Sequence, residues 1–227
     1  MSEIRPGDTR DRILDAAERL FMENGYDGAS MRQITGEAGV NLAAVNYHFG
    51  SKEALISEVF RRRLDWLNEE RMRALDAHEA AAEGQPVKPS AIVDAFFGTM
   101  LRMAEDETLG GVTFLRLLGR TLGEPSQFIR TLMAHEYQTV MERYKAALFR
   151  ALPEVPKAEI VWRFHFMLGA TSYAIAGTDA LRLVTDWQIE NEGEMDRLEN
   201  MMPRLMSFLL GGLRAPLPQF PGGPPDA

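Results

Sequence analysis

The sequence of 227 residues contains no cysteine, which excludes a disulfide framework, a thiol nucleophile and a cysteine-based zinc site. It also lacks any run of about eighteen apolar residues, the length that a membrane-spanning helix requires. Residues 1–12 are polar and mixed in charge, without the apolar segment of a secretion signal. We therefore expect a cytoplasmic protein that does not associate with membranes.

The motifs of common enzyme classes are absent as well. There is no glycine-rich phosphate loop, no Gly-x-Ser-x-Gly and no His-Glu-x-x-His. His135 and His165 are isolated on apolar stretches, where a lone histidine is more often a core residue than a ligand or a base. The sequence therefore predicts no catalytic residue, no metal site, no cofactor and no enzyme.

A net positive charge is missing too. The chain carries a formal net charge of −8, and residues 1–60 contain six lysines and arginines against ten aspartates and glutamates. Taken alone, this balance argues against nucleic-acid binding. The positions of the acidic residues matter more than their number, because Glu37 is the only acidic residue between Ser30 and Lys52. An acidic body also suppresses non-specific DNA binding, so the affinity would depend on one well-placed face.

No strand pattern and no internal repeat occur, whereas apolar residues recur at helical spacing along most of the chain. This pattern predicts an all-α fold. The three consecutive residues Arg61, Arg62 and Arg63 are expected to form a solvated basic turn of a long helix. Residues 83–89 have the composition of a linker, and residues 178–192 are expected to be irregular or partly helical. Helices are predicted at 9–24, 51–82, 90–104, 111–123, 125–152, 157–177 and 194–211.

A short predicted helix follows Asn41, whose side chain can cap its first turn, and ends at Gly50, which can close it in a left-handed conformation. A helix of two turns is unstable alone, so its presence between longer helices requires a reason. Ser30 caps a preceding helix, and a turn at Gly39 joins the two as in a helix-turn-helix. The local pattern assigns Val45 and Phe49 to the core, and for Tyr47 and His48 it leaves a core or a surface position open.

These segments resemble the DNA-binding domain of the tetracycline-repressor (TetR) family of bacterial transcription factors, from about Thr9 to Phe60. The resemblance implies an N-terminal three-helix helix-turn-helix domain at 9–60. A long helix would join it to a helical-bundle domain at 61–213 for effector binding and dimerisation. Residues 1–8 and 214–227 are expected to be a disordered arm and a disordered tail. The matching segments are Ile13–Phe21, Gly25-Tyr26, Ser30–Ile34, Ala38–Val40 and Val45–Leu55.

The resemblance also assigns expected DNA contacts. Base edges in the major groove would be met by small or amide side chains, and phosphates by hydroxyl, imidazole and cationic groups. Few hydrogen-bonding groups are left for bases, so part of the specificity would be indirect. The groove-facing residues would be Leu42, Ala43 and Asn46. The phosphate contacts would be Ser30, Arg32, Tyr47, His48 and Lys52.

Methionine and aromatic residues in the C-terminal part could line a ligand cavity between helices, because they adapt to varied apolar shapes. Core packing is the alternative for each of them, and the family resemblance is what favours a pocket. The candidates are Met100, Met103, Phe114, Leu118, Phe128, Met141, Trp162, Phe166, Met167 and Tyr173. The polar groups best placed to orient a ligand are Arg116, Arg120, His135 and His165.

The predicted helices at 157–177 and 194–211 carry more apolar surface than a monomer can cover. The resemblance implies that they form a four-helix bundle across the two-fold axis of a homodimer, and Gly169 and Ala170 would allow close approach. We therefore expect a repressor that releases a palindromic double-stranded DNA operator when it binds a small apolar or amphipathic molecule. The alternative is a helical small-molecule-binding protein that does not regulate by binding DNA.

Overall fold

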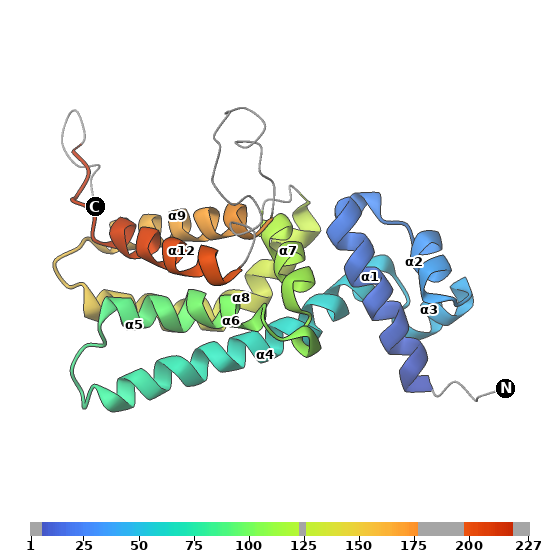
Figure 1. Cartoon of the computed structure of the whole chain (residues 1–227), viewed down its shortest axis with the longest axis horizontal. Helices are drawn as coiled ribbons and strands as arrows, with labels where there is room; N and C mark the ends of the chain where they lie inside the picture. The colour runs from blue at the N-terminus through green and yellow to red at the C-terminus, as the bar shows by residue number, and fades with distance from the viewer. Residues whose placement is uncertain (1–5, 123–125, 177–197, 220–227) are drawn as a thin grey trace.

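The computed structural model describes residues 6–122, 126–176 and 198–219. Within these ranges every regular element is a helix, which confirms the all-α prediction. The molecule is elongated, with α1 (Pro6–Gly28), α2 (Met31–Ala38) and α3 (Leu42–Phe49) at one end and a helical bundle at the other (Figure 1). α4 (Lys52–Ala81) runs without a break from the first part along the bundle, so the boundary expected at residue 60 lies inside a helix.

The first helix is longer than the predicted 9–24. It begins at Pro6, because proline has a backbone angle suited to the first turn and needs no amide donor there. The expected arm at 1–8 is therefore wrong for residues 6–8, and residues 1–5 lie outside the described part. Gly25, with φ 71° and ψ 177°, kinks the helix and does not end it.

The bundle follows the sequence pattern closely. α5 (Pro89–Val93), a π-helical turn η1 (Asp94–Gly98) and α6 (Thr99–Met103) form one continuous rod, with Pro89 at its start. The predicted region 178–192 lies outside the described residues, and residues 214–219 of the expected tail form no helix. The remaining elements are η2 (Glu107–Leu109), α7 (Gly111–Leu122), α8 (Gln127–Ala151), α9 (Lys157–Ala176) and α12 (Leu198–Leu213).

Aromatic rings occupy the centre of the bundle. The Phe96 ring centroid lies 5.0 Å from that of Phe164 and 5.1 Å from that of Tyr144, both edge to face. Such pairs contribute about 1 kcal/mol each beyond the burial of their area. These contacts join the rod that contains η1 to α8 and α9, and they give the bundle a defined packing around that π-helical turn.

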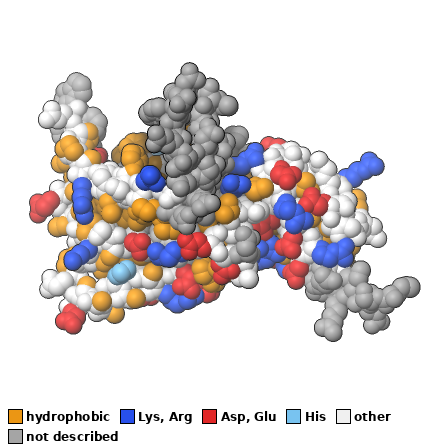
Figure 2. All heavy atoms as spheres, in the orientation of Figure 1, with side chains coloured by type: hydrophobic (Ala, Val, Ile, Leu, Met, Phe, Trp, Pro, Cys, Tyr) orange, Lys and Arg blue, Asp and Glu red, His pale blue; other side chains and the backbone are white. Residues whose placement is uncertain are grey.

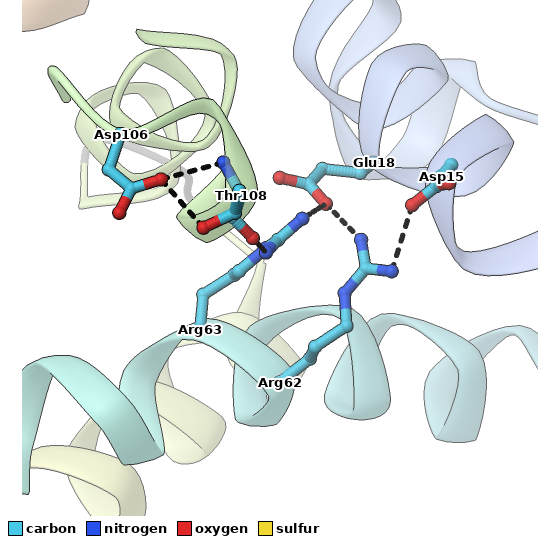
Figure 3. A network of polar contacts seen from close by, with 6 residues as sticks. All are labelled: Asp15, Glu18, Arg62, Arg63, Asp106 and Thr108. Carbon is cyan, nitrogen blue, oxygen red and sulfur yellow. Dashed lines mark hydrogen bonds and ion pairs between the residues drawn. The ribbon is translucent and has the colours of Figure 1, made fainter. Parts of the chain in front are cut away.

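A polar cluster lies where α1 meets α4 and the segment before α7, and it joins the N-terminal helices to the bundle (Figure 3). The Glu18 carboxylate on α1 is buried and accepts hydrogen bonds from Arg62 and from Arg63, the latter at 3.4 Å. Arg62 also donates to Asp15 at 2.8 Å, and Arg63 donates to the Thr108 carbonyl at 2.8 Å. The prediction of a solvated basic turn is therefore wrong for Arg62 and Arg63, because α1 and the segment before α7 cover them.

Two further contacts hold α7 against α1. Arg120 donates to the carbonyl oxygens of Met22 and, at 3.0 Å, of Glu23. Gly110 has φ +95°, and a Cβ atom there would come within 2.9 Å of both Glu18 Oε1 and Arg63 Nε. The junction therefore requires a glycine at position 110.

No helix that the structure describes is long and apolar enough to cross a membrane.

Candidate nucleic-acid interface and ligand cavity

α2 begins with a reciprocal cap. The Ser30 hydroxyl oxygen accepts the Gln33 backbone N–H at 3.2 Å, and the Gln33 side-chain oxygen accepts the Ser30 backbone N–H at 2.9 Å. This capping box satisfies two amide donors of the helix start. Ser30 and Arg32 are both exposed at this end of the helix, as a phosphate contact requires.

The turn between α2 and α3 depends on Gly39. Its φ of 64° lies in the left-handed region, and a Cβ atom there would come 2.9 Å from Arg12 Nη2. Arg12, from α1, donates to the carbonyls of Ala38 and, at 3.1 Å, of Gly39. Arg12 thus satisfies the carbonyl end of α2 and fixes the angle at which α3 leaves the turn.

α3 presents one exposed face. Asn41 accepts the Ala44 backbone N–H at 2.9 Å at its start, and Gly50 closes it with φ 77°. Val45 and Phe49 are buried against the domain core, as predicted. The side chains at the predicted groove-facing positions Leu42, Ala43 and Asn46 are all exposed.

Tyr47 and His48 differ in how far their side chains are exposed. The Tyr47 side chain is 86% exposed, so the surface alternative holds for it. His48 is half-buried, with its ring centroid 5.2 Å from that of Tyr47 and 6.1 Å from that of Phe49. The imidazole therefore packs beneath the exposed tyrosine and can support its orientation.

Lys52 begins α4 beside this face. Its ammonium nitrogen lies 4.4 Å from the centroid of the Tyr26 ring, a cation–π distance. The Tyr26 hydroxyl donates to Glu53 at 3.0 Å. Burial and the neighbouring Glu53 carboxylate raise the pKa of Tyr26 to about 12, so the phenol is neutral at physiological pH.

Charge alone would not have located this face. Acidic and basic side chains are interleaved over the side of the molecule shown in Figure 2. Glu37, the single carboxylate between Ser30 and Lys52, forms an ion pair with Arg19 at 2.7 Å and is partly neutralised by it. Arg10, on α1, pairs with Glu58, and its guanidinium carbon lies 5.4 Å from the Phe49 ring centroid.

The bundle contains two adjoining cavities. The outer cleft, of about 710 Å³, lies between α8 and α9 and includes His135, Lys145 and His165. The inner cavity, of about 210 Å³, lies among α4, the η1–α6 rod, α7, α8 and α9. The side chains common to both linings are Ala134, Tyr137, Met141 and Leu168.

Three of the ten predicted lining residues, Met100, Leu118 and Met141, do line the inner cavity. The prediction is wrong for Trp162, Phe166 and Tyr173, which are each more than half exposed because they lie on the outer stripe of α9. Of the others, Met103, Phe114 and Met167 are buried core residues outside both linings, and Phe128 packs on Tyr26 with ring centroids 5.5 Å apart.

Of the four polar groups expected to orient a ligand, two line a cavity and two do not. His135 and His165 line the outer cleft, whereas Arg120 is engaged with α1 and Arg116 is exposed. Arg71, on α4, lines the inner cavity but was not among the polar groups predicted from the sequence. The signal was present in the sequence, because Arg71 continues an apolar stripe of buried positions, Leu64, Leu67 and Leu75.

Comparisons with known proteins agree with this geometry. Residues 13–59 match the family model described as bacterial regulatory proteins, tetR family. Residues 94–212, more than half of the chain, match the model described as tetracyclin repressor-like, C-terminal domain. The regulator LmrA of Bacillus subtilis is 37% identical over 79 residues, which are 34% of this chain and 42% of LmrA. The repressor KstR2 of Mycolicibacterium smegmatis is 33% identical over 79 residues, which are 35% of this chain and 38% of KstR2.

Solved structures extend the likeness to nearly the whole chain. KstR2 of Mycobacterium tuberculosis, a ketosteroid transcriptional regulator, has a TM-score of 0.59 at 17% identity, covering 89% of this chain and 93% of that one. FadR of Bacillus subtilis, in complex with stearoyl-CoA, has a TM-score of 0.56 at 15% identity, covering 89% and 98%. At these identities the likeness shows the fold alone. On the two family models together, the chain belongs to the TetR family of bacterial regulatory proteins.

Proposed function

We propose that the protein is a ligand-responsive, sequence-specific regulator of transcription, most simply a repressor. The observation that carries this proposal is the exposed face of α3, capped at both ends and held by a buried Val45 and Phe49. Exposed Ala43 and Asn46 are small or polar enough to approach base edges, and Leu42 lies exposed on the same helix. Tyr47 and Lys52 flank these side chains as phosphate contacts.

A homodimer would supply the second recognition helix that a palindromic operator requires. The outer stripe of α9 exposes Trp162, Phe166 and Tyr173, and α12 exposes Phe208 to 67%. A Cβ atom added at Gly169 would meet nothing within 4 Å, so this part of α9 is open to close approach. Such a stripe is larger than the isolated apolar residues normal on a monomer and supports a helix-to-helix interface with a second copy.

The inner cavity provides the route for a ligand to act on DNA binding. Its wall includes α4, and α4 begins with Lys52 at the proposed DNA face. A ligand that prefers one position of α4 by about 5 kcal/mol would convert a mostly competent dimer into a mostly incompetent one. The apolar lining favours an apolar or amphipathic ligand, and the stearoyl-CoA named in the FadR complex supports the same class at the level of the fold.

Selection of bound duplexes from a random DNA pool tests the proposal. We expect enrichment of a palindrome whose half-sites are spaced so that two recognition helices, roughly 34–36 Å apart, enter successive major grooves. Flat, sequence-independent binding at micromolar protein would overturn it. That result would favour the alternative, a helical small-molecule-binding protein that does not regulate by binding DNA.

A further inference from the structure

Arg71 is a buried charge in the centre of the bundle. It lies on α4 and is 1% exposed, the largest of the fully buried side chains among the described residues. Loss of hydration lowers the pKa of Arg71, but a guanidinium remains protonated in proteins. The inner cavity therefore has a permanent positive charge in its wall.

The partners of Arg71 within the described part of the chain are all neutral. Its Nε donates to the Phe96 carbonyl at 3.0 Å, and Nη1 donates to the Asn68 side-chain oxygen at 3.3 Å. The guanidinium carbon lies 3.8 Å from the Phe96 ring centroid. None of the ion pairs formed between described residues includes Arg71.

Arg163 provides a comparison within the same bundle. It is the other buried arginine of the described residues, at 6% exposure, and it pairs with Glu159 at 2.8 Å. Burying a charge is costly unless an opposite charge and hydrogen bonds compensate it. Among the described residues Arg71 has hydrogen-bond partners but no opposite charge, so an anion bound beside it would complete the site.

The surroundings of Arg71 leave space for such an anion. The inner cavity is lined mainly by apolar side chains, among them Met100 and Leu118, and Arg71 is the single charged residue among the described residues of its lining. The π-helical turn η1 contributes both the Phe96 carbonyl and the Phe96 ring. Single π turns inside α-helices are frequent at functional sites, because they displace a carbonyl from the regular ladder.

We propose that Arg71 binds the carboxylate of a monoanionic amphipathic ligand. Its apolar body would fill the inner cavity and pass Tyr137, Met141 and Leu168 into the outer cleft. This inference rests on the proposed function as a ligand-responsive regulator and names the chemical class of the ligand. One guanidinium compensates one negative charge and presents two parallel donors that match a carboxylate. A phosphate dianion would leave a second charge buried without compensation.

The same contacts connect the ligand to α4. A carboxylate at Arg71 competes with the Phe96 carbonyl and with Asn68 for the guanidinium donors. Asn68 also donates from Nδ2 to the Glu136 carbonyl at 3.0 Å, so it ties α4 to α8. Binding of the anion therefore exchanges the bonds that hold α4 against η1 for bonds to the ligand, which changes how α4 is held.

The test compares acids with their uncharged isosteres on the full chain without DNA. The probes are decanoate with decanamide and 2-naphthoate with 2-naphthamide, measured by calorimetry and by thermal unfolding. We expect at least one acid to bind wild-type protein about tenfold or more tightly than its amide, as a charge-assisted contact in a dry site would give. Arg71→Met should abolish the preference while amide binding remains, and Arg71→Lys should retain part of it.

Arg73→Met is the matched control, because Arg73 lies on the same helix but is exposed and pairs with Glu70. It should leave the acid preference unchanged. Equal affinity of acids and amides for wild-type protein, no binding of either acid below about 1 mM, or a preserved preference in Arg71→Met would each overturn the proposal. If Arg71→Met does not fold, the wild-type comparison and Arg71→Lys still decide. A failure to select an operator would overturn the proposed function alone, since these measurements contain no DNA.

Discussion

Lys52 and Tyr26 form a cation–π pair, with the ammonium nitrogen 4.4 Å from the ring centroid, at the edge of the proposed DNA face. The Tyr26 ring in turn contacts Phe128 of α8, with centroids 5.5 Å apart. The side chain expected to hold a phosphate is therefore oriented by a ring that also touches α8 of the bundle. This gives Lys52 a defined position before DNA arrives and reduces the side-chain entropy lost on binding.

Lys52→Ala should weaken binding to all DNA sequences by a similar factor. One phosphate contact is lost, so the slope of log affinity against log salt concentration should decrease in magnitude by about 1. Fluorescence anisotropy of an operator duplex across a salt series measures this slope. Lys88→Ala, an exposed lysine at the start of the bundle, is the control and should change neither value. An unchanged slope in Lys52→Ala would show that Lys52 contacts no phosphate.

Tyr47→Phe and Asn46→Ala should separate affinity from specificity. The exposed Tyr47 hydroxyl is assigned to a phosphate, so its removal should weaken binding to all sites by about 1 kcal/mol without changing their ranking. Asn46 is assigned to a base edge, so its truncation should change the preferred sequence at one position of each half-site. Selection experiments with each variant measure the ranking. A changed ranking for Tyr47→Phe, or an unchanged one for Asn46→Ala, contradicts these assignments.

Glu18→Gln should lower the free energy of unfolding by about 3 kcal/mol, because two arginines would remain beside a neutral group in a buried site. Asp15→Asn is the matched control, since Asp15 contacts the same Arg62 but is half exposed. Its cost should be about 1 kcal/mol or less. Urea denaturation measures both values. Equal costs would show that burial of Glu18 adds nothing to the strength of the junction.

Glu79 should contribute a pH-dependent part of the stability. Hydrogen bonds and charge from Arg143, and then Arg150, lower the pKa of Glu79 below its ordinary value of 4.5. A lowered pKa in the folded state means that the stabilisation is fully present above about pH 4.5 and is lost as the pH falls through the folded-state value.

Thermal unfolding of wild-type protein and Glu79→Gln between about pH 6 and pH 3 tests this dependence. The difference between their midpoints should be largest at pH 6 and should shrink as the pH falls. Glu154→Gln, which removes an exposed carboxylate outside this network, should show a smaller difference at pH 6. A midpoint difference for Glu79→Gln that stays constant down to pH 3 would contradict the prediction.

Local chemistry allowed the helix-turn-helix to be predicted from the sequence alone. Ser30, Asn41 and Ser51 cap helices with their own side chains, and Gly39 and Gly50 end them with positive φ angles. These effects depend on residues within one turn of each other. The helical repeat also predicted the burial of Val45 and Phe49, whereas the groove-facing positions of α3 were expected from the family resemblance.

Tertiary structure decided the contacts between segments far apart in the chain. Glu18 and Arg62 are 44 residues apart, and only the packing of α1 on α4 shows that these charges neutralise each other away from solvent. The direction of a side chain on an apolar helix was equally undetermined. Trp162 and Phe166 face outward, because the neighbouring helices, which periodicity does not identify, determine which side of α9 is covered. The helical repeat places Arg71 on the buried stripe of α4, but only the packing of the other helices leaves a cavity beside it.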